Sequence, residues 1–305
     1  MPSIRQIEYL VALAETHHFR KAAEKTGVSQ PTLSAQLSAL EERLGVQLVE
    51  RSRSSVMLTP VGEQILAVGK RILRDTTEIR DIAASQKGDL SGSVRLGLPP
   101  TIGPYLLPLI LPNLHSTHPD LKLYVREQMP ESLPMSLAEG VHDVILTPLP
   151  VSQAELDSQA IFREPLFVVL PEDHKLAAKG YVEKSDLAGE QVLSLESGYQ
   201  LHDQVNVLCE EFGADLSFEY EGTSLDTLQQ MIAMGMGISF MPGLFVHAVL
   251  PRVSGVVALE LKGRSLSRVI GIAWRKSSNR TSEFEILKNY VRDAVADNFE
   301  GFALL

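Results

Sequence analysis

The stretch Ala22–Gly45, AAEKTGVSQPTLSAQLSALEERLG, determines the fold of the first part of this 305-residue chain. Ser29 is a favourable N-cap residue, and Pro31 is tolerated in the first turn of a helix. Gly27 and Gly45 mark the ends of the two helices on either side of Ser29. The apolar face of the second helix is formed by Leu33, Leu37, Leu40 and Leu44. Two short helices joined by a tight turn that contains glycine are typical of a helix-turn-helix.

The segments on either side extend this motif. Apolar residues recur at three- and four-residue spacing from Ile4 to Ala14, which predicts a first helix with one apolar face. After Gly45, residues 47–50 and 56–59 flank the basic segment Arg51–Ser55. We therefore expect a small hairpin with a basic tip, which makes residues 1–60 a winged helix-turn-helix domain.

Residues 61–88 carry a heptad-like apolar seam. Its members are Val61, Ile65, Val68, Ile72, Ile79 and Ile82. Three to four heptads at this spacing favour a linker helix that pairs with another helix. A helix packed on its own domain is the alternative, but the length and the seven-residue regularity favour dimerisation.

From about residue 90 the pattern alternates between predicted strands and predicted helices. The predicted strands are residues 94–98, 121–127, 144–147, 166–170, 191–195, 238–241 and 269–274, and a helix over 282–298 closes the chain. This alternation predicts an α/β domain with mainly parallel sheets, organised as one domain or as two lobes.

Composition excludes several classes of protein. The chain is 44% hydrophobic and 22% charged, which is ordinary for a globular protein, and it has no apolar run long enough for a membrane helix. The first residues lack the plan of a signal peptide, and the one cysteine, Cys209, excludes an intrachain disulfide. We therefore expect a cytoplasmic protein. The net charge of −10 is unevenly spread, because residues 1–89 hold 12 Lys and Arg against 11 Asp and Glu. The near-neutral first part is compatible with DNA binding.

Short polar side chains crowd the first half of the helix that follows Ser29. From there they can reach base edges in the major groove, and Gln suits adenine. A solvated helix face is the ordinary alternative, but the cap, the glycine turn and the leucine spacing favour DNA. The wing arginines are expected on phosphate or in the minor groove. The predicted DNA-binding residues are Ser29, Gln30, Pro31, Thr32, Ser34, Gln36, Arg51 and Arg53, and the partner is a double-stranded promoter operator.

The first 60 residues resemble the LysR-type transcriptional regulators. The resemblance is carried by Ala22-Ala23, Val28–Ser34, Leu37, Leu40-Glu41, Leu44-Gly45, Leu48, Arg51 and Thr59–Gly62. It implies a winged helix-turn-helix DNA-binding domain over residues 1–60, a linker and dimerisation helix over 61–88, and an effector-binding domain over 89–305. That last domain would be α/β and two-lobed, like periplasmic binding proteins. Lobe I would hold about residues 90–163 plus 269–305, and lobe II about 164–268.

Within that family the chain looks most like the OxyR branch of peroxide sensors. The supporting stretches are Ile7–Glu15, Gly103–Pro108, Asp186–Glu190, Leu201–Gln204 and Thr223–Leu228. That branch senses peroxide with two cysteines. The more C-terminal one matches Cys209, whereas the peroxide-reactive one matches Gln200, which cannot be oxidised to a disulfide. The basic neighbour usual in that loop is His202 here.

The effector site is expected where strands end and helices begin, since ligands of open α/β sheets bind there. Thr101 lies between a strand and a helix, where it is either a plain N-cap or an anion contact. The resemblance places His202 opposite Thr101. The predicted effector-binding residues are Thr101, Thr147, Gln200, His202, Asp203 and Thr223. Cys209 shares a helical face with apolar residues, so we expect it to be a buried, unreactive thiol.

We interpret the chain as a DNA-binding regulator that responds to a small polar or anionic effector held between two lobes. A homodimer or homotetramer is expected, with RNA polymerase as a partner if the protein is an activator. The alternative within this class is a redox regulator that acts through Cys209 alone. A small-molecule-binding protein or an enzyme that carries a DNA-binding head is the alternative of another class. The sequence shows no phosphate loop, nucleophile elbow or metal-ligand spacing, so we expect no catalytic residue, metal or cofactor.

Overall fold

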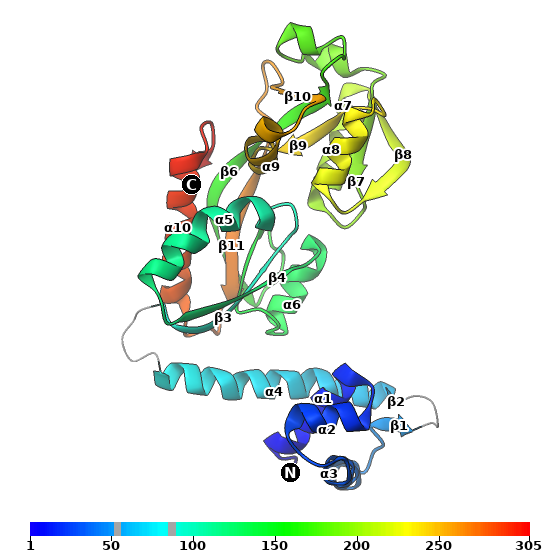
Figure 1. Ribbon diagram of the computed structural model, residues 1–305, viewed down its shortest axis with the longest axis vertical. Helices are drawn as coiled ribbons and strands as arrows, with labels where there is room; N and C mark the ends of the chain where they lie inside the picture. The colour runs from blue at the N-terminus through cyan, green and yellow to red at the C-terminus, as the bar shows by residue number, and fades with distance from the viewer. Residues whose placement is uncertain (52–55, 85–89) are drawn as a thin grey trace. The chain divides into compact units, whose positions relative to one another are not determined.

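The chain forms two compact units, Met1–Gln86 and Lys87–Leu305 (Figure 1). The structure is a computed structural model that describes residues 1–51, 56–84 and 90–305. Each unit has its own hydrophobic core.

Three short helices form the first unit. They are α1 (Ile4–Thr16), α2 (Phe19–Thr26) and α3 (Gln30–Leu44). Ser29 caps α3, because its side chain accepts a hydrogen bond from the backbone N–H of Thr32. Gly27 and Gly45 end α2 and α3 in the left-handed conformation. The core that joins the helices contains Tyr9, Leu10, Leu13, Ala22, Ala23, Leu33, Leu37 and Leu40. The predicted helix-turn-helix is confirmed.

A hairpin and a long helix complete this unit. Strands β1 (Val49–Arg51) and β2 (Val56–Leu58) pair antiparallel, as expected for the wing. Helix α4 (Pro60–Ala84) packs on α1 and begins beside the wing. Two glycines of α4 allow this close approach. A Cβ at Gly62 would lie 2.2 Å from the carbonyl oxygen of Leu48, and one at Gly69 would lie 2.8 Å from Cγ2 of Ile7. Residues 85–88 of the predicted linker lie outside the described residues.

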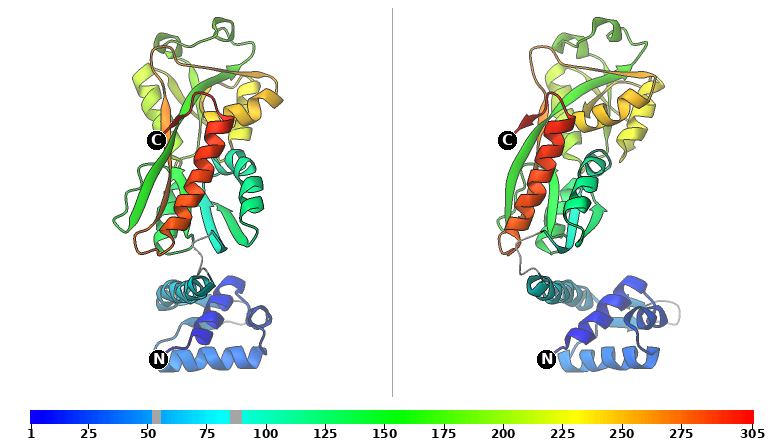
Figure 2. Two further views of the ribbon diagram at one scale, coloured as in Figure 1. Left: turned by 90° about the vertical axis from the view of Figure 1, so that its left-hand side faces the viewer. Right: turned by 60° about the vertical axis from the view of Figure 1, so that its left-hand side comes forward.

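The second unit is built around an eight-stranded sheet with helices on it. Strands β3 (Gly92–Leu98), β4 (Leu121–Glu127) and β5 (Val144–Pro148) pair in parallel, with β3 in the middle. With helices α5 (Gly103–Thr117), α6 (Leu133–Ala138) and α10 (Thr281–Asn298), they form lobe I. Helix α10 lies along the long strand β6 (Leu156–Pro171), as Figure 2 shows.

Lobe II is built around a parallel pair of strands, β7 (Gln191–Leu195) and β8 (Asp215–Gly222). Helices α7 (Gln200–Phe212) and α8 (Leu225–Ala233) pack on β7, as seen beside the β7 and β8 labels of Figure 1. The remaining elements of this lobe are β9 (Ser239–Pro242), α9 (Gly243–Val249) and β10 (Val256–Leu259). Short 3₁₀ helices are found at Pro130–Ser132 in lobe I and at Ala177–Lys179, Lys184–Leu187 and Leu250–Arg252 in lobe II.

Strand β6 joins the two lobes. Its first half pairs with β11 (Ser267–Arg275) and, over two residues, with β12 (Ala303–Leu304), whereas its second half pairs with β9 and β10. All of these pairings are antiparallel, and so is that of β11 with β5. The expectation of mainly parallel sheets is therefore wrong. Parallel strands form the outer part of each lobe, and the strands that connect the lobes run antiparallel.

Candidate functional site

The first candidate site is the exposed face of α3. Leu33, Leu37 and Leu40 are at most 1% exposed, so the opposite side of the helix faces solvent. Gln30, Pro31 and Thr32 are exposed at its first turn, which the hydroxyl of Ser29 holds through a 2.8 Å contact with the hydroxyl of Thr32. In the described part of the chain, the amide of Gln30 has no hydrogen-bond partner. Four predicted DNA-binding residues are therefore exposed on α3, namely Gln30, Pro31, Thr32 and Gln36, and Ser34 is half-buried.

A buried residue of α1 also contributes to this face. Gln6 is 3% exposed, and its Nε2 donates to Oε1 of Gln36 at 3.2 Å. Sequence analysis missed Gln6, because a Gln on a helix face carries no local signal of a partner on α3. The wing is described only in part. Arg51 ends β1, and Arg53 lies outside the described residues.

Helix α4 exposes an apolar seam. Val61, Val68, Ile72 and Ile79 are 41%, 44%, 36% and 65% exposed, whereas Ile65 packs on the core of the first unit. The exposed four lie at spacings of seven, four and seven residues, so they share one face of the helix. A row of exposed apolar side chains in heptad register fits pairing with a second helix. The side chain of Ile82 is not among those described.

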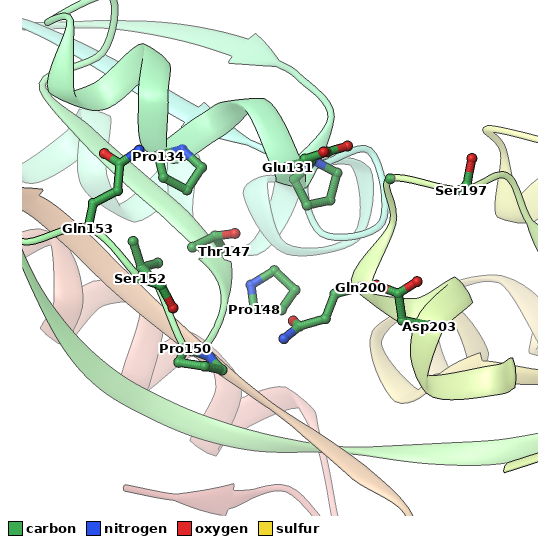
Figure 3. Close-up of a pocket in the computed structure, with 13 residues that line it drawn as sticks. Glu131, Pro134, Thr147, Pro148, Pro150, Ser152, Gln153, Ser197, Gln200 and Asp203 are labelled. Carbon is green, nitrogen blue, oxygen red and sulfur yellow. The ribbon is translucent and has the colours of Figure 1, made fainter. Parts of the chain in front are cut away.

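The second candidate site is a cleft of about 710 Å³ in the second unit (Figure 3). Lobe I contributes the end of β5 and the segments at residues 130–134 and 150–153, and lobe II contributes residues 197–203. Figure 3 shows Gln200 and Asp203 at the start of α7, across from Thr147 and Pro148. The structure thus brings together three predicted residues, Thr147, Gln200 and Asp203.

Gln200 connects the two lobes directly. Its Nε2 donates to the carbonyl oxygen of Leu149, 3.3 Å away in the segment that follows β5. Tyr105 of α5 makes a second connection, since its hydroxyl lies 3.0 Å from Oδ2 of Asp226 in α8. Burial of the Tyr105 ring, with the nearby Asp226 carboxylate, raises the pKa of this phenol, so it stays protonated and donates. Both bonds would have to change if the lobes moved apart.

The charged side chains of the cleft lining are both carboxylates, which accept hydrogen bonds. Glu131 and Asp203 are exposed carboxylates, and neither has a hydrogen-bond or ion-pair partner in the described part of the chain. Since the Nε2 of Gln200 is engaged by Leu149, its Oε1 remains to accept. Among the residues that the structure describes, no Lys, Arg or His side chain lines this cleft.

The other three predicted effector residues are not among those that line the cleft. Thr101 is buried, and its hydroxyl accepts from Arg268 at 3.3 Å. Nδ1 of His202 lies 2.7 Å from the carbonyl oxygen of Leu195, and Thr223 is exposed while its carbonyl oxygen accepts from Tyr199. Thr101 and His202 are therefore both engaged in hydrogen bonds within the protein.

Sequence analysis also missed the group that holds Thr101. Arg268 of β11 and Glu164 of β6 form a buried ion pair, with Nε and Oε2 at 2.6 Å and exposures of 5% and 0%. Arg268 additionally donates to the backbone oxygen of Thr101, and Glu164 accepts from the backbone N–H of Leu244 in α9. This pair lies where β6 changes partners between the lobes. It therefore connects the turn before α5 in lobe I to α9 in lobe II.

Cys209 is buried in α7, as predicted. It is 2% exposed and belongs to the same hydrophobic core as Val205, Leu208 and Phe212. Burial raises the pKa of the thiol to about 11, with smaller contributions from Asp215 and Glu210. The nucleophilic thiolate is consequently scarce at neutral pH.

Two family descriptions match the chain. Residues 4–63 match the bacterial regulatory helix-turn-helix protein of the lysR family, and residues 87–296 match the LysR substrate binding domain. The chain therefore belongs to the LysR family, and it is a DNA-binding transcriptional regulator. In the described ranges no helix is long and apolar enough to cross a membrane, and no three His, Cys, Asp or Glu side chains are grouped as metal ligands.

The relatives of the chain include peroxide regulators. It is 39% identical to the DNA-binding transcriptional dual regulator OxyR of Escherichia coli over 98% of this chain and 97% of that protein. It is 30% identical to the regulator EstR of Acinetobacter baylyi over 97% and 98%. Among solved structures, a full-length OxyR variant from Pseudomonas aeruginosa matches with a TM-score of 0.76 at 34% identity, over 95% of this chain and 94% of that one. An H₂O₂-bound OxyR mutant of Corynebacterium glutamicum matches with a TM-score of 0.68 at 31% identity, over 98% and 94%.

Proposed function

We propose that this regulator responds to a small polar molecule that binds in the cleft between its lobes. The observation that carries the proposal is the position of Gln200. The side chain lines the cleft and at the same time hydrogen-bonds the opposite lobe through Leu149. A ligand that donates to the free Oε1 of Gln200 would act on the same amide, and a shift of this side chain would break the contact with Leu149 and so change the closure of the lobes.

The lining favours particular ligands. The carboxylates of Glu131 and Asp203 and the Oε1 of Gln200 can accept hydrogen bonds. Among the residues that the structure describes, no basic side chain lines the cleft. A ligand rich in hydrogen-bond donors, neutral or cationic, suits this set better than an anion does. The sequence left both a polar and an anionic effector open, and the cleft supports the first.

The family membership does not imply peroxide chemistry for this chain. Several relatives are named for peroxide, and the resemblance matches their reactive cysteine to Gln200. Oxidation would thus fall on Cys209, whose pKa of about 11 and 2% exposure oppose it. A peroxide response through an intrachain disulfide is excluded by the cysteine count.

DNA binding, dimerisation and effector binding are proposed to work together in one mechanism. We propose that α3 and the wing bind operator DNA in the cytoplasm through the predicted residues, and that the exposed seam of α4 pairs with that of a second copy. The proposed division remains residues 1–60, 61–88 and 89–305, with lobes of about 90–163 plus 269–305 and about 164–268. The exchange of β6 partners near residue 165 supports the lobe boundary. Effector binding would change the spacing of two DNA-binding heads and, in an activator, their contact with RNA polymerase.

A thermal-shift screen of the full chain tests the effector assignment. Three matched four-carbon probes are included with a metabolite set: diaminobutane (a dication), succinamide (neutral) and succinate (a dianion). We expect hits among neutral and cationic compounds, and we expect each shift to be lost in Gln200→Ala and Asp203→Asn. Asn206→Ala, on the same helix, is the matched control and should keep the shift.

Two results would contradict the proposal. One is a set of hits that are all anions. The other is a shift that persists unchanged in Gln200→Ala and Asp203→Asn. Hydrogen peroxide is a separate arm, in which a response that needs Cys209 would support the redox alternative instead.

A further inference from the structure

The side chain of Gln36 is exposed to solvent, and its amide is held in one orientation. It is exposed on α3, next to the core face, and its Oε1 accepts from the Nε2 of Gln6 at 3.2 Å. Gln6 is almost fully buried at 3% exposure and lies in the first turn of α1. A residue of α1 therefore determines which end of the Gln36 amide is available.

The direction of this bond follows from the donors and acceptors around Gln6. The backbone N–H of Ser3 can only donate, and it points at one end of the Gln6 amide at 3.1 Å. That end must be the oxygen, which is the arrangement of a capping box. The other end is then Nε2, and it also faces the backbone oxygen of Gln36 at 3.3 Å, which can only accept. Both contacts thus assign the same orientation to Gln6.

The orientation of Gln36 follows in turn. Because Nε2 of Gln6 is a donor, the end of Gln36 that faces it must be Oε1. Its Nε2 is left exposed, and in the described part of the chain this NH₂ group has no partner. Gln30 differs, since both ends of its amide are free to pair with adenine, which needs a donor and an acceptor together.

We propose that Gln6 is a positioning residue that makes Gln36 a hydrogen-bond donor to an acceptor on the operator. The acceptor is a base edge in the major groove (N7 or O6 of a purine, or O4 of thymine) or a phosphate oxygen. This inference rests on the proposed binding of α3 to DNA. It adds a determinant of DNA binding that lies on α1, outside α3.

The test is a change of Gln6 that reverses the orientation of Gln36. Gln6→Glu keeps an acceptor for Ser3, and Glu is favourable at this position of a helix. Its second carboxylate oxygen can only accept, so the bond to the backbone oxygen of Gln36 is lost and Gln36 must turn Nε2 inward and expose Oε1. The full-length wild type, Gln6→Glu, Gln36→Ala and the double variant are each used to select sequences from a pool of random-sequence duplexes, and affinities for the wild-type consensus are measured.

A base-edge contact predicts an altered consensus. At the position that loses its preference in Gln36→Ala, Gln6→Glu should favour bases that offer a donor, adenine or cytosine, by about 2- to 10-fold. A phosphate contact instead predicts an unchanged consensus and a similar loss of affinity on all sequences. In both cases the effect should vanish when Gln6→Glu is combined with Gln36→Ala, apart from the effect of the added charge. Arg5→Gln removes one positive charge at the adjacent residue and serves as the matched control for that effect.

The results that would overturn the inference are distinct from those that would overturn the proposed function. An effect of Gln6→Glu that is the same with and without Gln36 would show that Gln6 does not act through it. A Gln36→Ala variant with the wild-type consensus and affinity would show that Gln36 makes no contact. Either result leaves DNA binding by α3 intact, whereas a wild-type chain that binds no duplex would overturn both.

Discussion

Helix α3 and the cleft of the second unit hold their polar side chains in different ways. On α3 the amide of Gln30 and the exposed Nε2 of Gln36 have no partner in the described part of the chain. In the cleft, Gln200 is already bonded to Leu149, and Thr101 and His202, which do not line it, are bonded to Arg268 and Leu195. A helix with free groups can bind DNA without rearrangement. A ligand that moves the Gln200 amide must break its existing contact with Leu149, which is what a switch requires.

The largest expected effect is a loss of dimerisation and of operator binding that leaves the cleft unaffected. Ile72→Asp places a carboxylate in the seam of α4, where a paired helix would bury it without a partner. The dimer should dissociate, and operator affinity should fall by about 100-fold or more, because two linked heads bind more tightly than one. Light scattering measures the mass, and gel shift measures the affinity.

The control for Ile72→Asp adds the same charge outside the seam. Ala67 is exposed on another side of α4, so Ala67→Asp should keep the mass and the affinity of the wild type. Effector-induced thermal shifts should survive in both variants, since the cleft is in the other unit. A wild-type mass for Ile72→Asp would show that the seam is not the dimer interface.

The second effect falls on the effector unit. Arg268→Met leaves Glu164 buried at 0% exposure without its cation, which should lower the stability of this unit by about 3–5 kcal/mol. Chemical denaturation followed by tryptophan fluorescence reports on this unit, because Trp274 is the chain's one tryptophan and lies in β11.

An exposed pair provides the comparison for Arg268. Arg264 pairs with Glu211 at side-chain exposures of 50% and 35%, so Arg264→Met should cost far less stability than Arg268→Met. Equal losses for the two variants would mean that the buried pair does not hold the lobes together.

A smaller effect is expected on the DNA-facing helix. Gln30→Ala removes hydrogen bonds to a base edge and should weaken binding to the selected operator by about 1–3 kcal/mol. Random duplex should be bound as by the wild type. Fluorescence anisotropy on both DNAs checks this, and equal losses on the two would remove Gln30 from base recognition. Arg53→Ala should behave in the opposite way, with a uniform loss and a smaller dependence on salt.

The smallest effect is expected at Cys209. The thiol is buried and its pKa is raised to about 11, so Cys209→Ser should leave DNA binding and regulation nearly unchanged, with or without peroxide. A promoter-reporter assay under sub-lethal peroxide checks this. A response in the wild type that disappears in Cys209→Ser would support the redox alternative and shift attention from the cleft to α7.

The difference between the two regions also decides what the sequence could predict. The cap at Ser29 and the leucine spacing of α3 lie within one 24-residue stretch, so local chemistry sufficed for the helix and its exposed face. The cleft joins residues from 130 to 203, and Thr147, Gln200 and Asp203 could be named only because strand ends attract ligands. The engagement of Thr101 by Arg268 depends on pairing across 167 positions, which no local pattern encodes.

The missed strands have a similar cause. The first half of β6, Leu156–Pro165, mixes polar and apolar residues, and its longest apolar run is Ala160–Phe162. It is a strand because β11 on one side and, at its end, β12 on the other satisfy its backbone groups. The mixed sheet was missed with it, since strand direction is decided by those distant pairings.

The tight seating of α4 on α1 has a mechanical consequence. Gly62 and Gly69 leave no room even for a methyl group, so α4 lies in close contact with the rest of the first unit. We therefore expect α4 and the helix-turn-helix to move together as one rigid body. The 25 residues of α4 span about 37 Å at 1.5 Å per residue. A tilt of about 10° at one end displaces the other by roughly 6 Å, close to the rise of two base pairs. A modest angular change is therefore enough to displace the DNA-binding residues by about two base pairs along an operator.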